Sequence, residues 1–361
     1  MAVVVSENSL ALSSLNAICP YYTMYPLDFP LQVLKEHGKS GEWVIDPFCG
    51  RGTTNFAARL LSMPSIGIDS SPVAAALAKA KLASAAPSRV VASARAILKS
   101  AKEPTSMPTG DFWKLAYHEN TIVQICQLRE ALLTECTSDT RILLRAIILG
   151  ALHGPRPKGE PSYFSNQSPR TFAPKPNYAV KFWTAREMWP VDVDVLSIIK
   201  KRADRYLAEP APNVRGKVQL GDSRVAGTFN GIPKARFVVT SPPYFGMRTY
   251  LPDQWLRLWF LGGPDFVEYR QHPAQLVFAS EKVRPEHESP APDVGDSVPA
   301  AEFRVIALDS LVKMKLIAFY DKDRTHLRDM ISVGLIDQSW RSRLPVLLAE
   351  RVQQILDTPD G

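Results

Sequence analysis

Two stretches of the 361-residue chain combine residue types that can bind and position a reactive ligand. In the first, an apolar run from Trp43 ends in the acid Asp46, and the Gly-Arg-Gly sequence at 50–52 leads into a helical pattern. Glycine has no Cβ, so a ligand can approach the backbone of such a turn, and the N–H groups that begin the next helix favour negative charge. A second apolar run ends in Asp69, about 20 residues further on, where a nucleotide-binding βαβ unit carries its ribose-binding carboxylate. We therefore expect a strand, a turn, a helix and a second strand around a nucleotide-like ligand.

The residues of this turn argue against a diphosphate ligand. A dinucleotide site has a third glycine after the Gly-x-Gly pair, but position 55 is Asn. The chain also lacks the complete Gly-x-x-x-x-Gly-Lys-Ser/Thr pattern of a phosphate-binding loop. The ligand predicted for this turn is thus nucleotide-like without a pyrophosphate.

The second stretch, 234–246, is an apolar run followed by Ser241, two prolines and the aromatic residue Tyr244. Proline fixes the backbone φ angle, so the loop after the run is stiff and holds its polar atoms in a defined geometry. We expect a strand that ends in a rigid loop with Tyr244 at its tip.

Together the two stretches resemble a known family. Asp46-Pro47-Phe48-Cys49-Gly50-Arg51-Gly52-Thr53-Thr54 resembles the cofactor motif of amino-group DNA methyltransferases, which bind S-adenosylmethionine, and Ser241-Pro242-Pro243-Tyr244 resembles their catalytic loop. The resemblance implies that the first loop surrounds the methionine part of the cofactor, that Asp69 binds the ribose hydroxyls and that Asp222 contacts the adenine amino group. The cofactor-binding residues that it implies are Asp46, Pro47, Phe48, Cys49, Gly50, Gly52, Thr53, Thr54, Asp69, Ser70, Asp222 and Ser223, and the catalytic residues are Ser241, Pro242, Pro243 and Tyr244.

The residue types of the catalytic loop suit methyl transfer to an exocyclic amine of a base. Such an amine is a poor nucleophile because its lone pair is delocalised into the ring, so acceptors must hold it pyramidal and aim it at the methyl group. We expect Ser241 Oγ and the Pro242 carbonyl to accept hydrogen bonds from the amine, and Tyr244 to stack on a flipped base. A methyl sulfonium is already activated, so the prediction includes no metal, nucleophilic cysteine or covalent intermediate.

Composition and charge set the broad class of the protein. The net charge of +7 suits a polyanionic partner, and 45% apolar residues provide for one large domain or two smaller ones. Cys19, Cys49, Cys126 and Cys136 form no Cys-x-x-Cys pair, so we expect neither zinc nor a disulfide framework, and a reducing cytoplasm. The N-terminus lacks the features of an export signal, and no apolar run reaches about 18 residues, so we expect no membrane span.

The segment before the first motif is expected to lie beside it in space. Residues 19–35 begin as a proline-aromatic loop and lead into a helix near Phe29. In the family that the chain resembles, this segment packs next to the methionine part of the cofactor. A surface loop over residues 22–30 is the alternative.

Residues 85–215 are interpreted as an insertion that recognises the target. The pattern from 109 to 153 predicts helices with apolar core stripes, and helical spacing returns at 195–206 with Lys200, Lys201 and Arg202 on the wet face. Between them, prolines and aromatic residues at 154–183 alternate with basic residues, a composition that can neutralise phosphates and stack on bases. We expect this segment to be a DNA-contacting loop, with a solvated connector as the alternative. The expected DNA-binding residues are Arg156, Lys158, Arg170, Lys175 and Lys181, together with Arg248 beyond the catalytic loop.

The C-terminal part differs in character. After an aromatic helix at 247–262, a complete enzyme of this family has further strands, but only residues 274–279 are strand-like, and 281–301 has a disordered composition. Through residues 303–316 and 321–330, the C-terminal part at about 271–361 resembles the C-terminal helical part of nucleotidyltransferase-like proteins of the toxin–antitoxin type. It lacks their catalytic Gly-Ser and paired-Asp loop, so no transferase chemistry is implied. A charged, solvated helix face is favoured over a metal site for Asp321, Asp323, His326 and Asp329.

The predicted fold class is α/β, with a Rossmann-like doubly wound methyltransferase sheet, complete or truncated, a largely helical insertion and a helical C-terminal segment. The predicted segments are 1–84 with the cofactor motif, 85–215 for target recognition, 216–270 with the catalytic motif, and 271–361.

The predicted function is a site-specific DNA methyltransferase that uses S-adenosylmethionine, as in restriction-modification. Ser at position 241 favours cytosine N4, because family members with Ser-Pro-Pro-Tyr are commonly cytosine enzymes. Adenine N6 methylation, RNA methylation and an inactive, truncated nucleic-acid-binding relic stay open as alternatives. The expected partners are DNA and a cognate restriction nuclease, and the sequence does not determine the oligomeric state.

Overall fold

The computed structural model describes residues 13–21, 26–154, 161–166, 175–241, 251–267, 297–299, 304–319 and 321–358. Contacts between residues divide the chain into two units, one made of 1–243 with 249–269 and the other of 244–248 with 270–361. The sheet and the inserted helices belong to the first unit. The segment boundaries expected at 84, 215 and 270 stay predictions.

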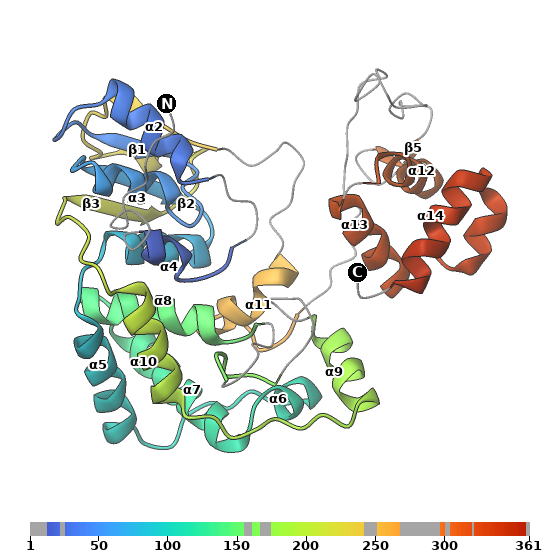
Figure 1. Ribbon diagram of the computed structural model, residues 1–361, viewed down its shortest axis with the longest axis horizontal. Helices are drawn as coiled ribbons and strands as arrows, with labels where there is room; N and C mark the ends of the chain where they lie inside the picture. The colour runs from blue at the N-terminus through green and yellow to red at the C-terminus, as the bar shows by residue number, and fades with distance from the viewer. Residues whose placement is uncertain are drawn as a thin grey trace. The chain divides into compact units, whose positions relative to one another are not determined.

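A four-stranded parallel sheet forms the centre of one half of the first unit (Figure 1). Its strands β1 (Val44–Asp46), β2 (Ser65–Asp69), β3 (Gly216–Leu220) and β4 (Phe237–Val238) lie in the order β3-β2-β1-β4. β1 and β2 are almost wholly buried, as expected for continuous apolar runs in a parallel sheet covered by helices. The α/β class and the parallel sheet agree with the sequence prediction, and the doubly wound completion of the sheet stays a prediction.

Three helices surround the strands that carry the first motif. α3 (Thr53–Leu60) connects β1 to β2, α2 (Asp28–His37) packs against α3, and α4 (Pro72–Leu82) follows β2. α4 begins as the sequence predicts, because Ser71 Oγ accepts a hydrogen bond from the Ala74 amide and Pro72 occupies the first turn. Both crossovers run between parallel neighbours, so each strand delivers its carboxyl end to the same edge of the sheet.

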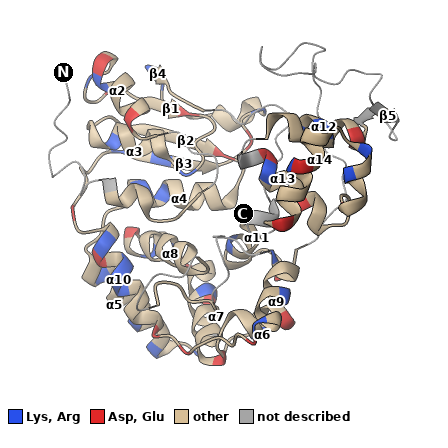
Figure 2. Cartoon of the chain, turned by 45° about the vertical axis from the view of Figure 1, so that its right-hand side comes forward, with Lys and Arg blue, Asp and Glu red and all other residues tan. Residues whose placement is uncertain are grey.

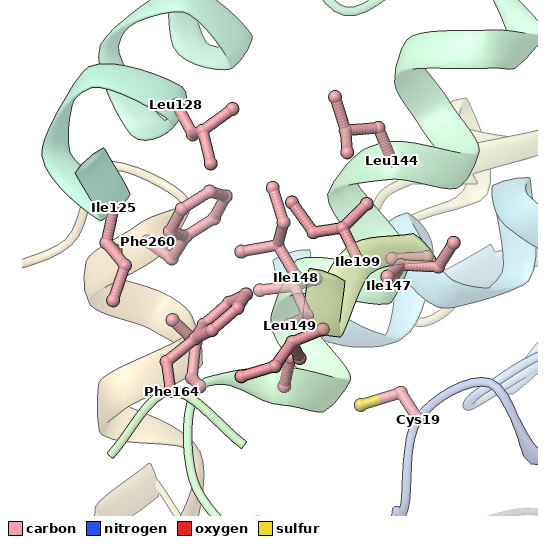
Figure 3. Packing of buried hydrophobic residues seen from close by; sticks show 14 of the residues in the cluster. Cys19, Ile125, Leu128, Leu144, Ile147, Ile148, Leu149, Phe164, Ile199 and Phe260 are labelled. Carbon is pink, nitrogen blue, oxygen red and sulfur yellow. The ribbon is translucent and has the colours of Figure 1, made fainter. Parts of the chain in front are cut away.

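The inserted segment is helical and shares one apolar core with α4. Its helices are α5 (Pro87–Ser100), α6 (Asp111–Ala116), α7 (Glu119–Thr134), α8 (Asp139–Ala151), α9 (Pro176–Ala185) and α10 (Val195–Tyr206), and α11 (Leu251–Phe260) joins them from beyond the catalytic loop. Figure 3 shows Ile148 and Leu149 of α8 in this core with Phe164 and Phe260. Short 3-10 helices lie at Ser13–Ala17 (η1) and Ala226–Phe229 (η2). The predicted helical character of 109–153 and 195–206 is confirmed.

Two expectations within the insertion are wrong. Residues 176–185, expected as part of a loop, form α9, because Pro176 occupies its first turn and Ala179 and Trp183 bury one face of the helix. Arg202, expected on the wet face of α10, exposes only 7% of its surface and donates from Nε and Nη2 to the Ser162 carbonyl. Lys200 and Lys201 are exposed as predicted, and basic residues are visible on α5 and α10 in Figure 2.

The second unit contains a small hairpin and a helical cluster. β5 (Ser297–Pro299) pairs antiparallel with β6 (Arg304–Ile306), and α12 (Leu308–Ala318), α13 (Asp321–Ser332), η4 (Gln338–Arg343) and α14 (Val346–Asp357) follow. Residues 297–299 therefore contradict the disordered character expected for 281–301, since pairing with β6 supplies the order that composition alone does not indicate. The strand-like segment 274–279 lies outside the described residues.

The charged residues of α13 are engaged with a neighbouring helix. Asp323 Oδ1 and His326 Nδ1 lie 3.3 and 2.8 Å from Nζ of Lys315, a mostly buried residue of α12, so these two residues do not form the purely solvated face that was expected. Within the described part of the chain, no group of three or more His, Cys, Asp or Glu residues is arranged to hold a metal ion.

Among the described residues, no helix combines the length and apolar character needed to cross a membrane.

Candidate functional site

The carboxyl edge of the sheet gathers the polar residues of both motifs. Asp46 ends β1, Asp69 ends β2, and Thr240 follows β4 directly beside β1. Thr240 Oγ1 donates a hydrogen bond of 2.6 Å to Asp46 Oδ1 across a sequence separation of 194 residues. In open parallel sheets, ligands bind at this edge. The two motifs that are far apart in the sequence are thus adjacent in the fold.

The turn between β1 and α3 depends on two glycines in the left-handed region. Gly50 has φ +50° and Gly52 has φ +78°, values that side chains with a Cβ rarely adopt. A Cβ on Gly52 would lie 2.8 Å from the Ala78 Cα in α4, whereas a Cβ on Gly50 would meet no atom within 4 Å. The turn therefore packs closely on α4 at Gly52 and is open at Gly50.

The residue that replaces the third glycine has a structural role. Asn55 is fully buried in α3, and its Nδ2 donates to Ser65 Oγ at 3.1 Å, which joins α3 to the start of β2. Gly67 of β2 leaves the space that the Asn55 side chain needs, since a Cβ there would lie 2.6 Å from Asn55 Oδ1. This close packing of α3 on β2 agrees with the absence of a dinucleotide pattern.

Asp69 is held by the backbone of the turn and of the next helix. Its Oδ2 accepts a hydrogen bond from the Gly50 amide, and its Oδ1 accepts one from the Ser71 amide, both at 2.8 Å. Burial raises the pKa of Asp69, and these two backbone hydrogen bonds offset part of that effect. Each carboxylate oxygen keeps a lone pair for a further donor. The carboxylate is therefore fixed in position and able to accept two hydroxyl groups.

Asp46 is fully buried and only half satisfied. Its Oδ1 accepts hydrogen bonds from the Phe48 amide at 3.1 Å and from Thr240 Oγ1, whereas its buried Oδ2 has no hydrogen bond of normal geometry. Burial raises the pKa of Asp46, and interactions with Thr240, Thr54 and Phe48 lower it in part. The hydroxyl proton of Thr54 is donated to the Val239 carbonyl at 3.1 Å, so it does not satisfy Oδ2 of Asp46. A buried carboxylate oxygen without a partner costs free energy, so this atom fits a ligand that brings an N–H donor or a positive charge.

The N-terminal segment reaches the site through Tyr21. Burial and the neighbouring charge of Asp69 raise the pKa of Tyr21 to about 12, and a hydrogen bond with Ser71 opposes this effect. Cys19 is buried two residues earlier. The position expected for residues 19–21 beside the first motif agrees with these contacts, and residues 22–25 lie outside the described part of the chain.

The loop after β3 joins the same edge of the sheet. Ser223 Oγ donates to the Pro47 carbonyl, which ties this loop to the first motif. Asp222 forms an ion pair with Arg224 at 2.7 Å and also accepts its backbone amide, and these hydrogen bonds lower the pKa of Asp222 to about 2. Asp222 is therefore ionised at neutral pH, beside the turn that carries Pro47.

The remaining predicted site residues fall into a described group and a group outside the described residues. Ser241 is exposed directly after Thr240, and Lys181 is exposed on α9, six residues after the N-cap residue Lys175. The predicted residues Pro242, Pro243, Tyr244, Arg248, Arg156, Lys158 and Arg170 lie outside the described residues.

A group of buried basic side chains was not predicted from the sequence. Arg51, Lys81, His153 and Arg257 expose between 0% and 9% of their surface. Burial lowers the pKa of His153 to about 3, with a smaller effect from the charge of Arg257, so the imidazole is neutral. The signal available was the presence of a basic residue within an otherwise apolar pattern, because a charged group is rarely buried without a specific reason.

Comparison with known proteins gives a family match over part of the chain. Residues 6–80 match the model of the N6/N4 methyltransferase family, described as DNA methylase, and this segment contains the Gly-rich turn and Asp69. No curated protein matches the chain. Among solved structures, the chain is similar to the rRNA methyltransferase AviRa from Streptomyces viridochromogenes, at 14% sequence identity over 66% of this chain and 68% of that chain, with a TM-score of 0.28. The family match supports an amino-methyltransferase as the class of enzyme.

Proposed function

We propose that this protein transfers a methyl group from S-adenosylmethionine to an exocyclic amine of a DNA base, with cytosine N4 as the favoured position. The observation that carries the proposal is the pair of acids at the carboxyl edge of the sheet, Asp46 with its unpartnered Oδ2 and Asp69 with both oxygens fixed by backbone amides. The family match over residues 6–80 supports the methyltransferase class.

The residues around the turn fit this cofactor. Asp69 is fixed so that its two oxygens can each accept a ribose hydroxyl. Asp46 Oδ2 lacks a donor, and the ammonium group of a methionine moiety supplies one together with a positive charge. The open space at Gly50 lets a ligand approach the backbone of the turn. When bound, the cofactor supplies an activated methyl group on a sulfonium.

The protein residues then have positioning roles. Thr240 bonds to Asp46, so the chain that enters the Ser241-Pro242-Pro243-Tyr244 loop is anchored to the cofactor turn. In the proposed mechanism, Ser241 Oγ and the Pro242 carbonyl accept hydrogen bonds from the target amine and orient its lone pair, and Tyr244 stacks on the flipped base. Orienting two reactants in this way accounts for a large part of the rate enhancement in such a transfer.

DNA as the substrate is supported by the net charge of +7 and by the basic residues of the insertion. Lys175 and Lys181 on α9, with Arg156, Lys158, Arg170 and Arg248, are proposed to contact its backbone. The role in restriction-modification, with a cognate nuclease as partner, rests on the resemblance of the two motifs.

A second candidate is a cofactor-binding or nucleic-acid-binding protein without activity. The observation that favours it is that the described residues of the first unit supply four parallel strands, while the family resemblance implies more. This candidate predicts cofactor binding without a methylated product.

The deciding experiment is mass spectrometry of nucleosides after the full chain is incubated with S-adenosylmethionine that carries a deuterated methyl group, together with mixed duplex DNA or, in a parallel reaction, with RNA. We expect deuterated N4-methylcytosine, and its loss in the Ser241→Ala and Tyr244→Ala variants while these variants still bind cofactor. Deuterated N6-methyladenine would agree with the proposed mechanism but would show that the target base is adenine, not cytosine. Label found only in RNA nucleosides would show that the substrate is RNA, not DNA. Folded protein that binds cofactor and yields no product would favour the inactive candidate.

A further inference from the structure

The cofactor turn carries a buried positive charge without a counter-ion. Arg51 lies between the two glycines of the turn and exposes 9% of its surface, and its buried Nε has no hydrogen-bond partner. Within the residues that the structure describes, its guanidinium forms no hydrogen bond or ion pair. Burial lowers the pKa of Arg51, because removal from water makes the charged form of the guanidinium less stable. The Nε group of Arg51 has therefore lost its hydration without gaining an acceptor, which is unfavourable.

A second buried cation lies near the first. Lys81 of α4 is fully buried, and its Nζ donates to a single neutral acceptor, Asn16 Oδ1, at 2.6 Å. Burial lowers the pKa of Lys81, and the charge of Arg51 lowers it further, so the two cations act on one another. Neither cation has a carboxylate within ion-pair distance in the described part of the chain. Two neighbouring cations without an anion indicate a site that is completed by an anionic ligand.

Arg59 of α3 shows what a purely structural buried arginine requires in this fold. It exposes 1% of its surface, and its guanidinium donates to the carbonyls of Lys81, Ala83, Pro212 and Ala211. Arg59 thereby ties α3 to the end of α4 and to the chain before β3. Arg51 has none of these acceptors, so its burial has no equivalent structural explanation.

The surroundings of Arg51 favour an anion further. α3 begins at Thr53, two residues after Arg51, and the N–H groups of its first turn attract negative charge. A further basic residue, Arg257 of α11, is buried, and its Nη2 has no hydrogen-bond partner. The charge of Arg257 lowers the pKa of Cys19 and of Tyr21 in part. Among the described residues, no ion pair joins Asp46 or Asp69 to these basic groups, and both carboxylates are instead hydrogen-bonded to neutral donors.

We propose that Arg51, supported by Lys81, binds the carboxylate of the α-amino acid group of the ligand at this turn. The inference rests on the proposed function, since it assigns the carboxylate of the methionine part of the cofactor to a residue outside the predicted cofactor-binding set. A guanidinium matches a carboxylate with two parallel hydrogen bonds, which gives selectivity as well as affinity. The turn would then recognise both ends of a zwitterion, with Asp46 on the ammonium side and Arg51 on the carboxylate side.

The test compares two ligands that differ only in the carboxylate. Calorimetric titration of the full chain with S-adenosylhomocysteine and with its decarboxylated analogue is expected to show at least tenfold tighter binding of the intact ligand. Arg51→Met is expected to remove most of this difference by weakening the intact ligand, while the affinity for the decarboxylated analogue changes less than twofold. Arg51→Lys keeps the charge and should restore part of the preference, and Arg95→Met, an exposed arginine of α5, should leave both affinities unchanged.

Thermal unfolding of the ligand-free variants gives a second measurement. Removal of an unpaired buried charge should leave the melting temperature of Arg51→Met equal to or above that of the wild type, whereas Arg59→Met should lower it. Saturating S-adenosylhomocysteine should raise the melting temperature of Arg51→Met less than that of the wild type.

The outcomes separate this inference from the proposed function. If the wild type binds neither ligand, the proposed function fails. If the wild type binds both ligands equally, or if Arg51→Met weakens both by the same factor, the assignment of the carboxylate to Arg51 is overturned while cofactor binding stands. The wild-type comparison does not depend on the folding of any variant.

Discussion

Asp46 is fully buried and Asp69 is half-buried, and the hydrogen bonds of the two carboxylates differ. Asp69 uses both oxygens to accept backbone amides, whereas Asp46 leaves Oδ2 without a partner. Replacement by Asn keeps one carbonyl oxygen and removes the charge, so it suits Asp46 and does not suit Asp69, where an NH₂ group would face a backbone N–H. The same substitution should therefore act in opposite directions at the two positions.

For Asp46→Asn we expect a ligand-free protein that is more stable than the wild type at pH 7, by about 1 kcal/mol, because a neutral amide costs less to bury than a carboxylate whose Oδ2 has no partner. Burial raises the pKa of Asp46 in the folded state above its value in the unfolded chain. The folded state then binds the proton more readily, and the carboxylate lowers stability as the pH rises through the raised pKa. The gain in Asp46→Asn should thus shrink as the pH falls toward the ordinary range of aspartate. Thermal unfolding between pH 4 and pH 8 measures this dependence.

Asp69→Asn is the matched control, and it should lower the melting temperature at pH 7. A less stable Asp46→Asn protein would contradict the unsatisfied state of Oδ2.

At the residue scale, the sequence predicts the acids but not their partners. Asp46 and Asp69 are predicted because each ends an apolar run next to a Gly-rich turn. The environment of Arg51 cannot be predicted in this way, because it depends on Cys19 and Lys81, which act on Arg51 from other elements. Burial of an isolated charge is a property of the tertiary fold, so a sequence pattern does not reveal it.

At the scale of elements, the contact between the turn and α4 is the most constrained feature of the site. Gly52 combines a positive φ with a close approach to the Ala78 backbone, whereas Gly50 has only the positive φ. Substitutions at Gly50 and Gly52 therefore distinguish the cost of a positive φ from the cost of a steric contact with α4.

We expect Gly50→Ala to reduce the free energy of unfolding by about 1–2 kcal/mol, the cost of a left-handed residue with a Cβ. Gly52→Ala should cost about 1–3 kcal/mol more than Gly50→Ala, because α3 or α4 must also move to accommodate the Cβ. Urea unfolding of the two variants measures the difference, and titration with S-adenosylhomocysteine should show the larger loss of affinity for Gly52→Ala. Equal costs at the two positions would mean that α4 adjusts freely to the turn.

Helices are predicted correctly from the sequence where the apolar pattern extends over several turns. They are missed where the proline content suggests a loop. The apolar stripes of 109–153 correctly predict α6, α7 and α8. The proline-rich composition of 154–183 hides α9, because Pro176 starts a helix when it stands in the first turn. The hairpin of β5 and β6 is likewise missed, since strands of three residues carry too little periodicity to detect.

At the scale of the whole molecule, each of the two units has an apolar core of its own. In the first, buried residues of α4, α8 and α10 belong to one cluster with those of α11. In the second, Val312, Leu316, Leu327 and Val352 form a separate cluster. The sequence indicates this division through its change of composition and pattern after residue 270. It does not show that the C-terminal segment can form an apolar core.

Because the cores are separate, the two units should unfold as distinct cooperative transitions. Leu143 of α8 and Leu316 of α12 are both fully buried, one in each core. Replacing either leucine with alanine should cost about 2–5 kcal/mol through lost apolar contact and the cavity that is left. In differential scanning calorimetry of the full chain, Leu143→Ala should lower the melting temperature of one transition only, and Leu316→Ala that of the other. S-adenosylhomocysteine should raise only the transition that Leu143→Ala lowers, because the proposed cofactor residues all belong to the first unit. A single transition that both substitutions lower equally would show that the units fold as one.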